Sequence, residues 1–237
     1  MSDSPQTRPI ALNPLRWLLV VLFVACLLLP LAHWIDADVV NALDSRATGI
    51  EGRDTYRLLR VLGSAYFWML VFVVFVGEGF ARRDDPERGM AIRDRAGLWS
   101  RGLFVLISAM GSGLLAEVVK LVVRRGRPDE LLNRDATLSL TDPRTFDHVS
   151  MWPGTTMGNF WDAGDLGMAS SHAATAFGGM LALGVMWPRW RWVLLVLAGL
   201  SAYTRLQSRD HYVSDLVGGV MCAAVVVGAL VWTSRER

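Results

Sequence analysis

The chain has 237 residues, of which 52% are hydrophobic and only 19% are charged, and its mean hydropathy is +0.33. Soluble domains usually carry about 25% charged residues, so this composition indicates a polytopic membrane protein and excludes a disordered chain. The two cysteines, Cys26 and Cys222, both lie in apolar runs, which excludes a disulfide scaffold. The formal net charge of +2 by itself says little about partners.

Six apolar segments come close to the roughly 20 residues that a transmembrane helix needs. We predict helices over about residues 15–34, 61–80, 102–123, 168–187, 192–205 and 212–232. No internal repeat and no soluble domain interrupts this pattern. The sequence therefore predicts an all-α fold, a six-helix transmembrane bundle that forms a single domain over residues 1–237.

The first of these segments also has features of a signal peptide, because Arg16 precedes an apolar core. No convincing small-residue cleavage site follows it, and Pro30 and His33 are typical of a helix end. We therefore expect this segment to be retained as the first transmembrane helix.

Basic residues indicate the orientation in the membrane. Residues 81–101 hold six arginines, and the turn between the fourth and fifth helices adds Arg189 and Arg191. The positive-inside rule then places both termini in the cytoplasm. The Arg-rich connection over residues 124–167 falls on the opposite side, against the rule, and an anion-binding role would explain it. The aromatic residues of this connection could cover a site or rest on the lipid interface.

Ionisable side chains at membrane depth are costly and are functional candidates by default. Lys120, the single lysine of the chain, lies near the end of the third predicted helix, and Arg205 lies at the end of the fifth. His172 and Asp215 lie at the starts of the fourth and sixth helices. Because an odd-numbered helix ends on the side where the next one begins, all four residues should meet at one face. With cytoplasmic termini, that face is extracytoplasmic.

This set of residues suits phosphate chemistry. Lys120, Arg127 and Arg205 can neutralise a phosphate, and an arginine can hold two of its oxygens at once. Ser170 and Ser171 lie at a predicted helix start, where free backbone N–H groups favour an anion.

Two histidines supply what phosphoryl transfer still needs, a nucleophile and a proton donor. His211 and Asp215 are four residues apart, on one face of a helix if that turn is helical. The carboxylate can then fix the tautomer of the imidazole ring and stabilise its charged form.

Three motifs carry a resemblance to a known family. Lys120 to Pro128 reads as K-x6-R-P, Ala169 to His172 is similar to P-S-G-H, and Thr204 to Asp215 is similar to S-R-x5-H-x3-D. In this order and spacing they resemble the type 2 phosphatidic acid phosphatase (PAP2) superfamily of integral membrane lipid phosphatases. Ala169 stands where the family usually has proline, and Ser171 where it usually has glycine.

The resemblance implies a mechanism without a metal or other cofactor. It makes His211 the nucleophile that forms a phosphohistidine, Asp215 the residue that orients it, and His172 the acid that protonates the leaving group. The phosphate oxygens would be held by five residues, Lys120, Arg127, Ser170, Ser171 and Arg205. Water would then release inorganic phosphate.

Other polar residues have less specific interpretations. Glu117 lies one turn before Lys120, which favours a structural pair within one helix. Four further arginines could hold a second phosphate or contact anionic headgroups: Arg124, Arg125, Arg134 and Arg144.

The hypothesis is thus a lipid phosphatase whose site faces the periplasm or exterior, most simply from a bacterial inner membrane. Phosphatidic acid, phosphatidylglycerol phosphate, undecaprenyl diphosphate and lipid A phosphate all present suitable groups. A phosphotransferase of the same fold with a polyprenyl diphosphate donor, a headgroup binder or transporter, and a pseudo-phosphatase scaffold are alternatives. The expected partners are a lipid phosphate substrate and membrane lipids, with no nucleic acid, and the oligomeric state is left open.

Overall fold

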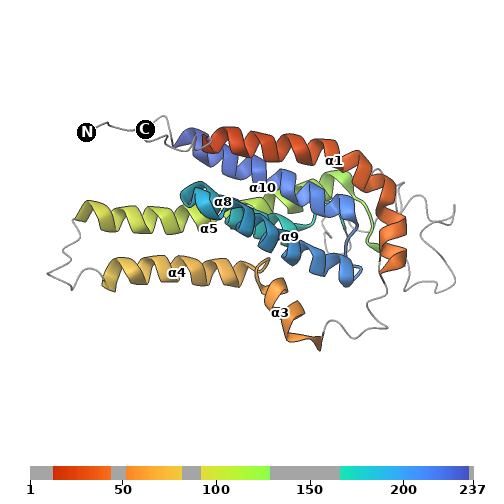
Figure 1. Cartoon of the computed structure of the whole chain (residues 1–237), viewed down its shortest axis with the longest axis horizontal. Helices are drawn as coiled ribbons and strands as arrows, with labels where there is room; N and C mark the ends of the chain where they lie inside the picture. Colours follow the sequence, from red (N-terminus) through yellow and green to blue (C-terminus); the bar gives the residue numbers. More distant parts are fainter. Residues whose placement is uncertain (1–12, 44–51, 82–91, 129–165, 235–237) are drawn as a thin grey trace, which may run out of the picture.

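The computed structural model describes residues 13–43, 52–81, 92–128 and 166–234. These residues form helices joined by turns, as Figure 1 shows. In chain order the elements are α1 (Pro14–Ala42), α3 (Asp54–Val61), α4 (Ala65–Ala81), α5 (Ile92–Val123), α8 (Ser171–Met186), the 3₁₀ helix η3 (Pro188–Trp190), α9 (Arg191–Gln207) and α10 (Val213–Thr233).

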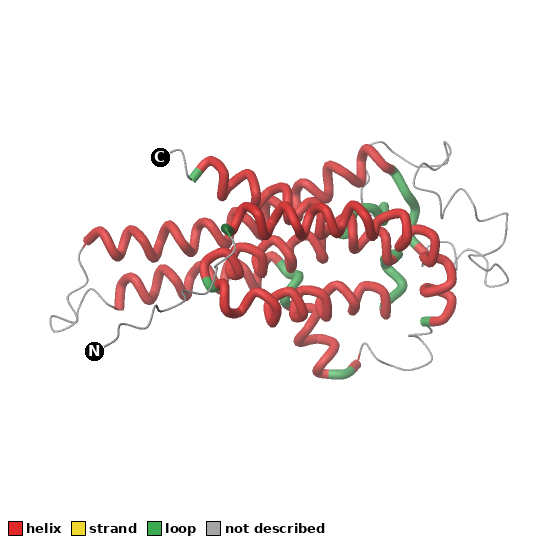
Figure 2. The backbone as a smooth tube through the Cα atoms, turned by 45° about the horizontal axis from the view of Figure 1, so that its top comes forward, coloured by secondary structure: helices red, strands yellow, loops and turns green. Residues whose placement is uncertain are grey.

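Helix α8 packs against three helices, α5, α9 and α10, while α1 packs on α10 and α4 packs on α5 (Figure 2). Small residues make this central position possible. A Cβ atom at Gly178 would meet the Ser108 carbonyl oxygen at 2.5 Å, and one at Gly179 would strike the Trp68 ring. Glycines at these two positions therefore let neighbouring helices approach closely, which is the usual function of small residues in membrane bundles.

Three helices of the described chain are long and apolar enough to cross a membrane alone: α1, residues Gly97–Val123 of α5, and α10. Helices α3 and α4 pass the same test together, but they are bent by 66°. Helix α8 has 16 residues and α9 has 17, fewer than a straight span usually needs. The predicted count of six spans is therefore not established by length and composition.

Several predicted boundaries were wrong, and the largest difference is at α5, which begins at Ile92, ten residues before the predicted start at 102. Helix α1 continues through Pro30 to Ala42, eight residues beyond the predicted end, because the acidic residue Asp36 is fully buried there and paired. Helix α8 begins at Ser171, three residues later than predicted, because the Ser170 side chain caps it. The second predicted segment starts in α3 and is interrupted before α4 begins at Ala65.

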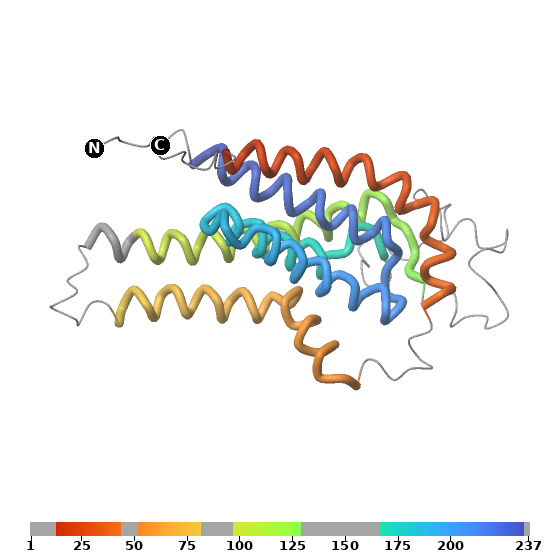
Figure 3. Tube along the Cα trace, viewed as in Figure 1, coloured from red at the N-terminus to blue at the C-terminus, as the bar shows by residue number. Residues whose placement is uncertain are grey.

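The ends of α5 and α9 and the starts of α8 and α10 lie at the same end of the bundle (Figure 3). The two ends of the connection after α5 are joined there by an isolated antiparallel bridge between Gly126 and Leu166, and the Gly167 amide donates to the Arg125 carbonyl at 2.7 Å. Residues 129–165, with the aromatic residues, Arg134 and Arg144, lie outside the described part of the chain.

Candidate active site

Ser170, the residue that caps α8, is tied to α10 by a backbone hydrogen bond. The Ser170 amide donates to the Asp215 carbonyl at 3.0 Å, and the Ser170 side chain accepts from the Ala173 amide at 3.4 Å. Gly219 of α10 faces the same turn, and a Cβ atom there would lie 2.8 Å from the Ser170 carbonyl oxygen. The helix start and the beginning of α10 are thereby fixed relative to each other.

Lys120 connects α5 to this turn. Its side chain is only 3% exposed, and Nζ donates to Glu117 Oε1 at 2.8 Å and to Ser171 Oγ at 3.2 Å. The pair with Glu117 confirms the expected contact within one helix. The hydroxyl of Ser171 therefore shares the ammonium with a carboxylate instead of opening space for the backbone, as glycine would at this position.

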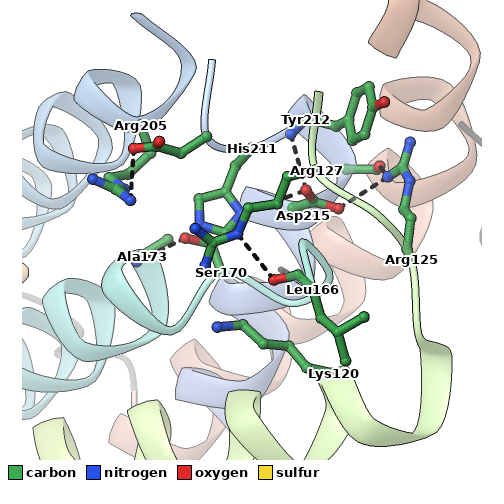
Figure 4. A network of polar contacts seen from close by, with 12 residues as sticks. Lys120, Arg125, Arg127, Leu166, Ser170, Ala173, Arg205, His211, Tyr212 and Asp215 are labelled. Atoms are coloured by element: carbon green, nitrogen blue, oxygen red, sulfur yellow. Dashed lines mark hydrogen bonds and ion pairs between the residues drawn. The ribbon is translucent and has the colours of Figure 1, made fainter. Parts of the chain in front are cut away.

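The two predicted arginines lie on different sides of His211 in Figure 4. Arg127 is partly buried, and its Nε donates to the Leu166 carbonyl at 3.3 Å. Arg205 pairs with Asp210 at 2.7 Å and is also largely enclosed. In Figure 4 Arg127 crosses in front of His211, while Arg205 lies to its left and Lys120 below it; we call these three residues the front cations.

His211 lies in the turn between α9 and α10, outside both helices, and is 2% exposed. Its Nδ1 faces Asp215 Oδ2 at 3.5 Å. Burial lowers the pKa of His211 below its usual range, although the Asp215 carboxylate opposes this effect. The imidazole is therefore neutral at neutral pH, which is the form that a nucleophile requires.

His172 lies in the first turn of α8, against the turn that joins α3 to α4. A Cβ atom at Gly63 would collide with the His172 ring, so only glycine fits the observed ring position. Within the described part of the chain, the buried His172 Nε2 has no hydrogen-bond partner. Arg60 at the end of α3 is near enough to act electrostatically on His172, and the sequence interpretation did not include it.

Behind His211, Asp215 belongs to a buried group whose pairing the sequence interpretation did not predict. It consists of four fully buried residues, and we call it the rear cluster: Asp36, Arg125, Ser214 and Asp215. Arg125 Nη1 binds Asp215 Oδ1 at 2.9 Å and Ser214 Oγ at 2.6 Å, while Nη2 binds Asp36 Oδ2 at 2.8 Å. The expectation that Arg125 holds a second phosphate or a headgroup was therefore wrong, because two carboxylates already occupy it.

The surroundings of Arg125 keep it charged. Its guanidinium carbon lies 3.8 Å from the centre of the Tyr212 ring, and the Tyr212 amide donates to Asp215 Oδ2 at 2.9 Å. Burial alone would lower the pKa of Arg125, but the Asp215 and Asp36 carboxylates outweigh it and raise that pKa. An acidic residue just beyond an apolar segment was the available signal for Asp36.

Among the residues that the structure describes, no three His, Cys, Asp or Glu side chains are grouped so that they could hold a metal ion. The predicted phosphate-binding and catalytic residues do lie together: Lys120 contacts Ser171, Ser170 contacts Asp215, and Asp215 faces His211. His172 and Arg205 adjoin the same histidine from α8 and α9. The arrangement thus surrounds one buried imidazole with three cations, and a carboxylate faces its Nδ1.

Comparison with known proteins gives a family and a fold. A model of the PAP2 superfamily matches residues 101–237, more than half of the chain. The fold is similar to a crystal structure described as the first transmembrane PAP2 type phosphatidylglycerolphosphate phosphatase from Bacillus subtilis, with a TM-score of 0.52 and 18% identity. The likeness covers 94% of this chain and 96% of that chain. Comparison with curated protein sequences gives no match.

The structural likeness extends over the N-terminal helices that the family model leaves out, and it confirms the predicted all-α transmembrane fold. The apolar helices and this fold make the chain an integral membrane protein. Since the family model covers more than half of the chain, including all three motifs, the chain belongs to the PAP2 superfamily.

Proposed function

We propose that this protein hydrolyses a phosphomonoester or diphosphate on a membrane lipid through a phosphohistidine formed on His211. The observation that carries the proposal is the placement of His211, a buried neutral imidazole with Asp215 behind it and the front cations before it. Family membership and the transmembrane fold support phosphatase activity toward a lipid phosphate in general terms.

In the first step His211 attacks the phosphorus atom. A P–N bond forms while the P–O bond to the lipid or leaving phosphate breaks, and His172 gives its proton to the departing oxygen. The dianionic phosphoryl group beside His172 favours the protonated form of that ring. Lys120, Arg127 and Arg205 hold the equatorial oxygens, where negative charge is concentrated in the transition state.

Asp215 acts on the nucleophile without touching the phosphate. As the P–N bond forms, the imidazole becomes positive, and the carboxylate 3.5 Å from Nδ1 stabilises that charge. In the second step a water molecule attacks phosphorus, the P–N bond breaks, and inorganic phosphate leaves. His172, now neutral, accepts the proton of the attacking water.

We place the site at the extracytoplasmic face of a bacterial inner membrane. Helix α1 begins and α10 ends at the end of the bundle opposite the site (Figure 1), and the basic residues of the connection before α5 favour a cytoplasmic position for that end. A substrate in the outer leaflet would then reach the front cations directly.

The test is release of inorganic phosphate by the purified protein in detergent, from phosphatidic acid, phosphatidylglycerol phosphate, undecaprenyl diphosphate and lipid A phosphate. We expect release from at least one lipid, and its loss in His211→Ala. Gln207→Ala, a substitution in the last turn of α9, is the matched control and should leave the rate within about twofold. Full activity of folded His211→Ala would overturn the phosphohistidine.

Two further arms of this experiment separate the alternatives. EDTA should leave the rate within about twofold, because the front cations supply the positive charge that Mg²⁺ supplies in other phosphoryl transfers. Strong inhibition that Mg²⁺ reverses would point to a metal-dependent reaction. Absence of release from every lipid, together with transfer from a polyprenyl diphosphate to an added lipid hydroxyl, would make the protein a phosphotransferase.

A further inference from the structure

The rear cluster joins a helix outside the family match to the catalytic carboxylate. Asp36 belongs to α1, whereas the family model begins at residue 101. Asp36, Arg125 and Asp215 are all fully buried, and burying charges is costly even when they are paired. Such a cluster adds little stability over apolar packing, so a role in positioning is the better explanation for it.

The two oxygens of Asp215 have different partners. Oδ1 is held by Arg125 at 2.9 Å, while Oδ2 accepts from the Tyr212 amide at 2.9 Å and faces His211 Nδ1. Arg125 therefore fixes the rotation of the carboxylate, which directs Oδ2 toward the nucleophile. Gly167 limits the space on this side as well, since a Cβ atom there would lie 2.8 Å from Oδ2.

Asp36 in turn fixes Arg125 and the first turn of α10. Asp36 Oδ1 accepts from the Ser214 amide at 2.9 Å, and Oδ2 accepts from the Ser214 hydroxyl and from Arg125 Nη2. One guanidinium thus lies between two carboxylates, which leaves one negative charge in excess. If Asp36 were neutral, Arg125 would cancel the charge of Asp215 and weaken its effect on His211.

We propose that Asp36 and Arg125 are positioning residues for the nucleophile: Arg125 aims Asp215 at His211, and Asp36 supplies the second negative charge that keeps Asp215 effective. This inference rests on the proposed function. It assigns to α1 a part in the chemistry of a site that is otherwise built from α5, α8, α9 and α10. Neither residue contacts the phosphate.

The charges that act on His211 come from four directions. Asp215 of α10 favours its protonated form, and the cations Arg205 of α9 and Arg127 after α5 oppose it. His172 of α8 lies close enough for the two rings to repel each other when both are charged. Behind these residues, two further titratable side chains adjoin the rear cluster: His33 Nδ1 faces Asp36 at 3.3 Å, and the Tyr212 ring lies against Arg125.

Two variants separate charge from geometry. Asp36→Asn removes the second negative charge, and we expect kcat to fall tenfold or more, KM to stay within about twofold, and the acid limb of the kcat profile to move to lower pH. Arg125→Lys keeps the positive charge, but a single ammonium cannot reproduce the guanidinium's simultaneous contacts with Asp36 and Asp215. It should lower kcat without moving the acid limb.

Asp38→Asn is the matched control, because Asp38 lies two residues further along α1 with its side chain exposed. It should match the wild type. Rates are normalised to folded protein, measured by gel filtration and thermal unfolding in detergent. A merely structural role would lower the folded fraction and leave kcat per folded molecule and the pH profile unchanged, which would overturn the proposal.

If Asp36→Asn yields no folded protein, unchanged kcat in Arg125→Lys overturns the proposal by itself. The failure of the proposed function is a separate result: a wild type that releases no phosphate overturns both ideas. An active wild type, an inactive His211→Ala and a wild-type-like Asp36→Asn overturn only the positioning role.

Discussion

Arg125 and Arg127 are separated by one residue in the sequence, yet they belong to opposite sides of His211. Arg125 is fully buried, with Nη1 and Nη2 each bound to a carboxylate, so its charge is already compensated. Arg127 remains partly exposed and donates through Nε to a backbone carbonyl, and among the described residues no carboxylate forms an ion pair with it. The comparison shows that two arginines close in sequence can differ in burial and in the carboxylates that they contact.

Loss of the Asp215 carboxylate should have the largest effect on catalysis. In Asp215→Asn the amide cannot stabilise the positive imidazole, and we expect kcat to fall by about 10³-fold or more, as for other carboxylates that orient a catalytic histidine. The measurement is lipid phosphate hydrolysis by folded protein in detergent. A variant that retains more than a tenth of the wild-type kcat would contradict the role of Asp215.

Loss of a front cation should act on phosphate binding as well as on the rate. Lys120→Ala removes an ammonium that is 3% exposed, and we expect kcat/KM to fall by about 10²-fold, the size of effect known for a transition-state donor. Lys120→Arg should recover only part of it, because a planar guanidinium does not fit between Glu117 and Ser171.

A control for this pair is Arg189→Lys, an exchange of the same two residue types in the η3 turn, where the side chain is exposed. It should leave kcat/KM unchanged. Full recovery by Lys120→Arg would show that charge alone is needed at this position, and that the contact with Ser171 has no part in binding.

The front of the site could be predicted from the sequence because its residues are polar where an apolar helix should continue or begin. Lys120 interrupts a predicted helix, and His172 and Asp215 begin two others, so parity alone placed them at one face. The short helix α3 and its Arg60 had no such signal, because that segment is not apolar and lies before the predicted span.

The rear of the site could not be predicted, because its partners are 89 and 90 residues apart and the pairing depends on packing. Asp36 follows a proline and a histidine that are typical of a helix end, and only the packing of α1 on α10 shows that the helix continues. From its place beside Arg127 in the sequence, Arg125 was expected to bind a phosphate or a lipid headgroup as well. The sequence identifies the candidate charged residues, whereas the packing of the helices determines which of their charges are paired.

Substitutions of Arg125 and Arg127 should differ most clearly in their effect on the stability of the protein. Arg125→Ala leaves two buried carboxylates without their shared partner, and breaking such a pair typically costs about 3–5 kcal/mol. Arg127→Ala removes a partly exposed side chain and should cost about 1 kcal/mol or less in the free energy of unfolding. Thermal unfolding in detergent checks this order, and equal losses for the two variants would contradict the distinction between front and rear.

The smallest effect concerns pH and tests how the two sides balance at His211. Burial, aided by the charges of Arg205 and Arg127, lowers the pKa of His211, while Asp215 opposes this. The neutral nucleophile should persist below pH 6.5, the usual pKa of histidine, so the acid limb of kcat/KM should lie below that pH.

The lowered pKa of His211 also affects folding. Below about pH 6.5 His211 binds a proton in the unfolded chain but not in the folded chain, so stability is lost as the pH falls. We expect the Tm in detergent to drop between pH 7.5 and 5.5, and less so in His211→Gln. An equal drop in both proteins would mean that another group, and not His211, carries the pH dependence.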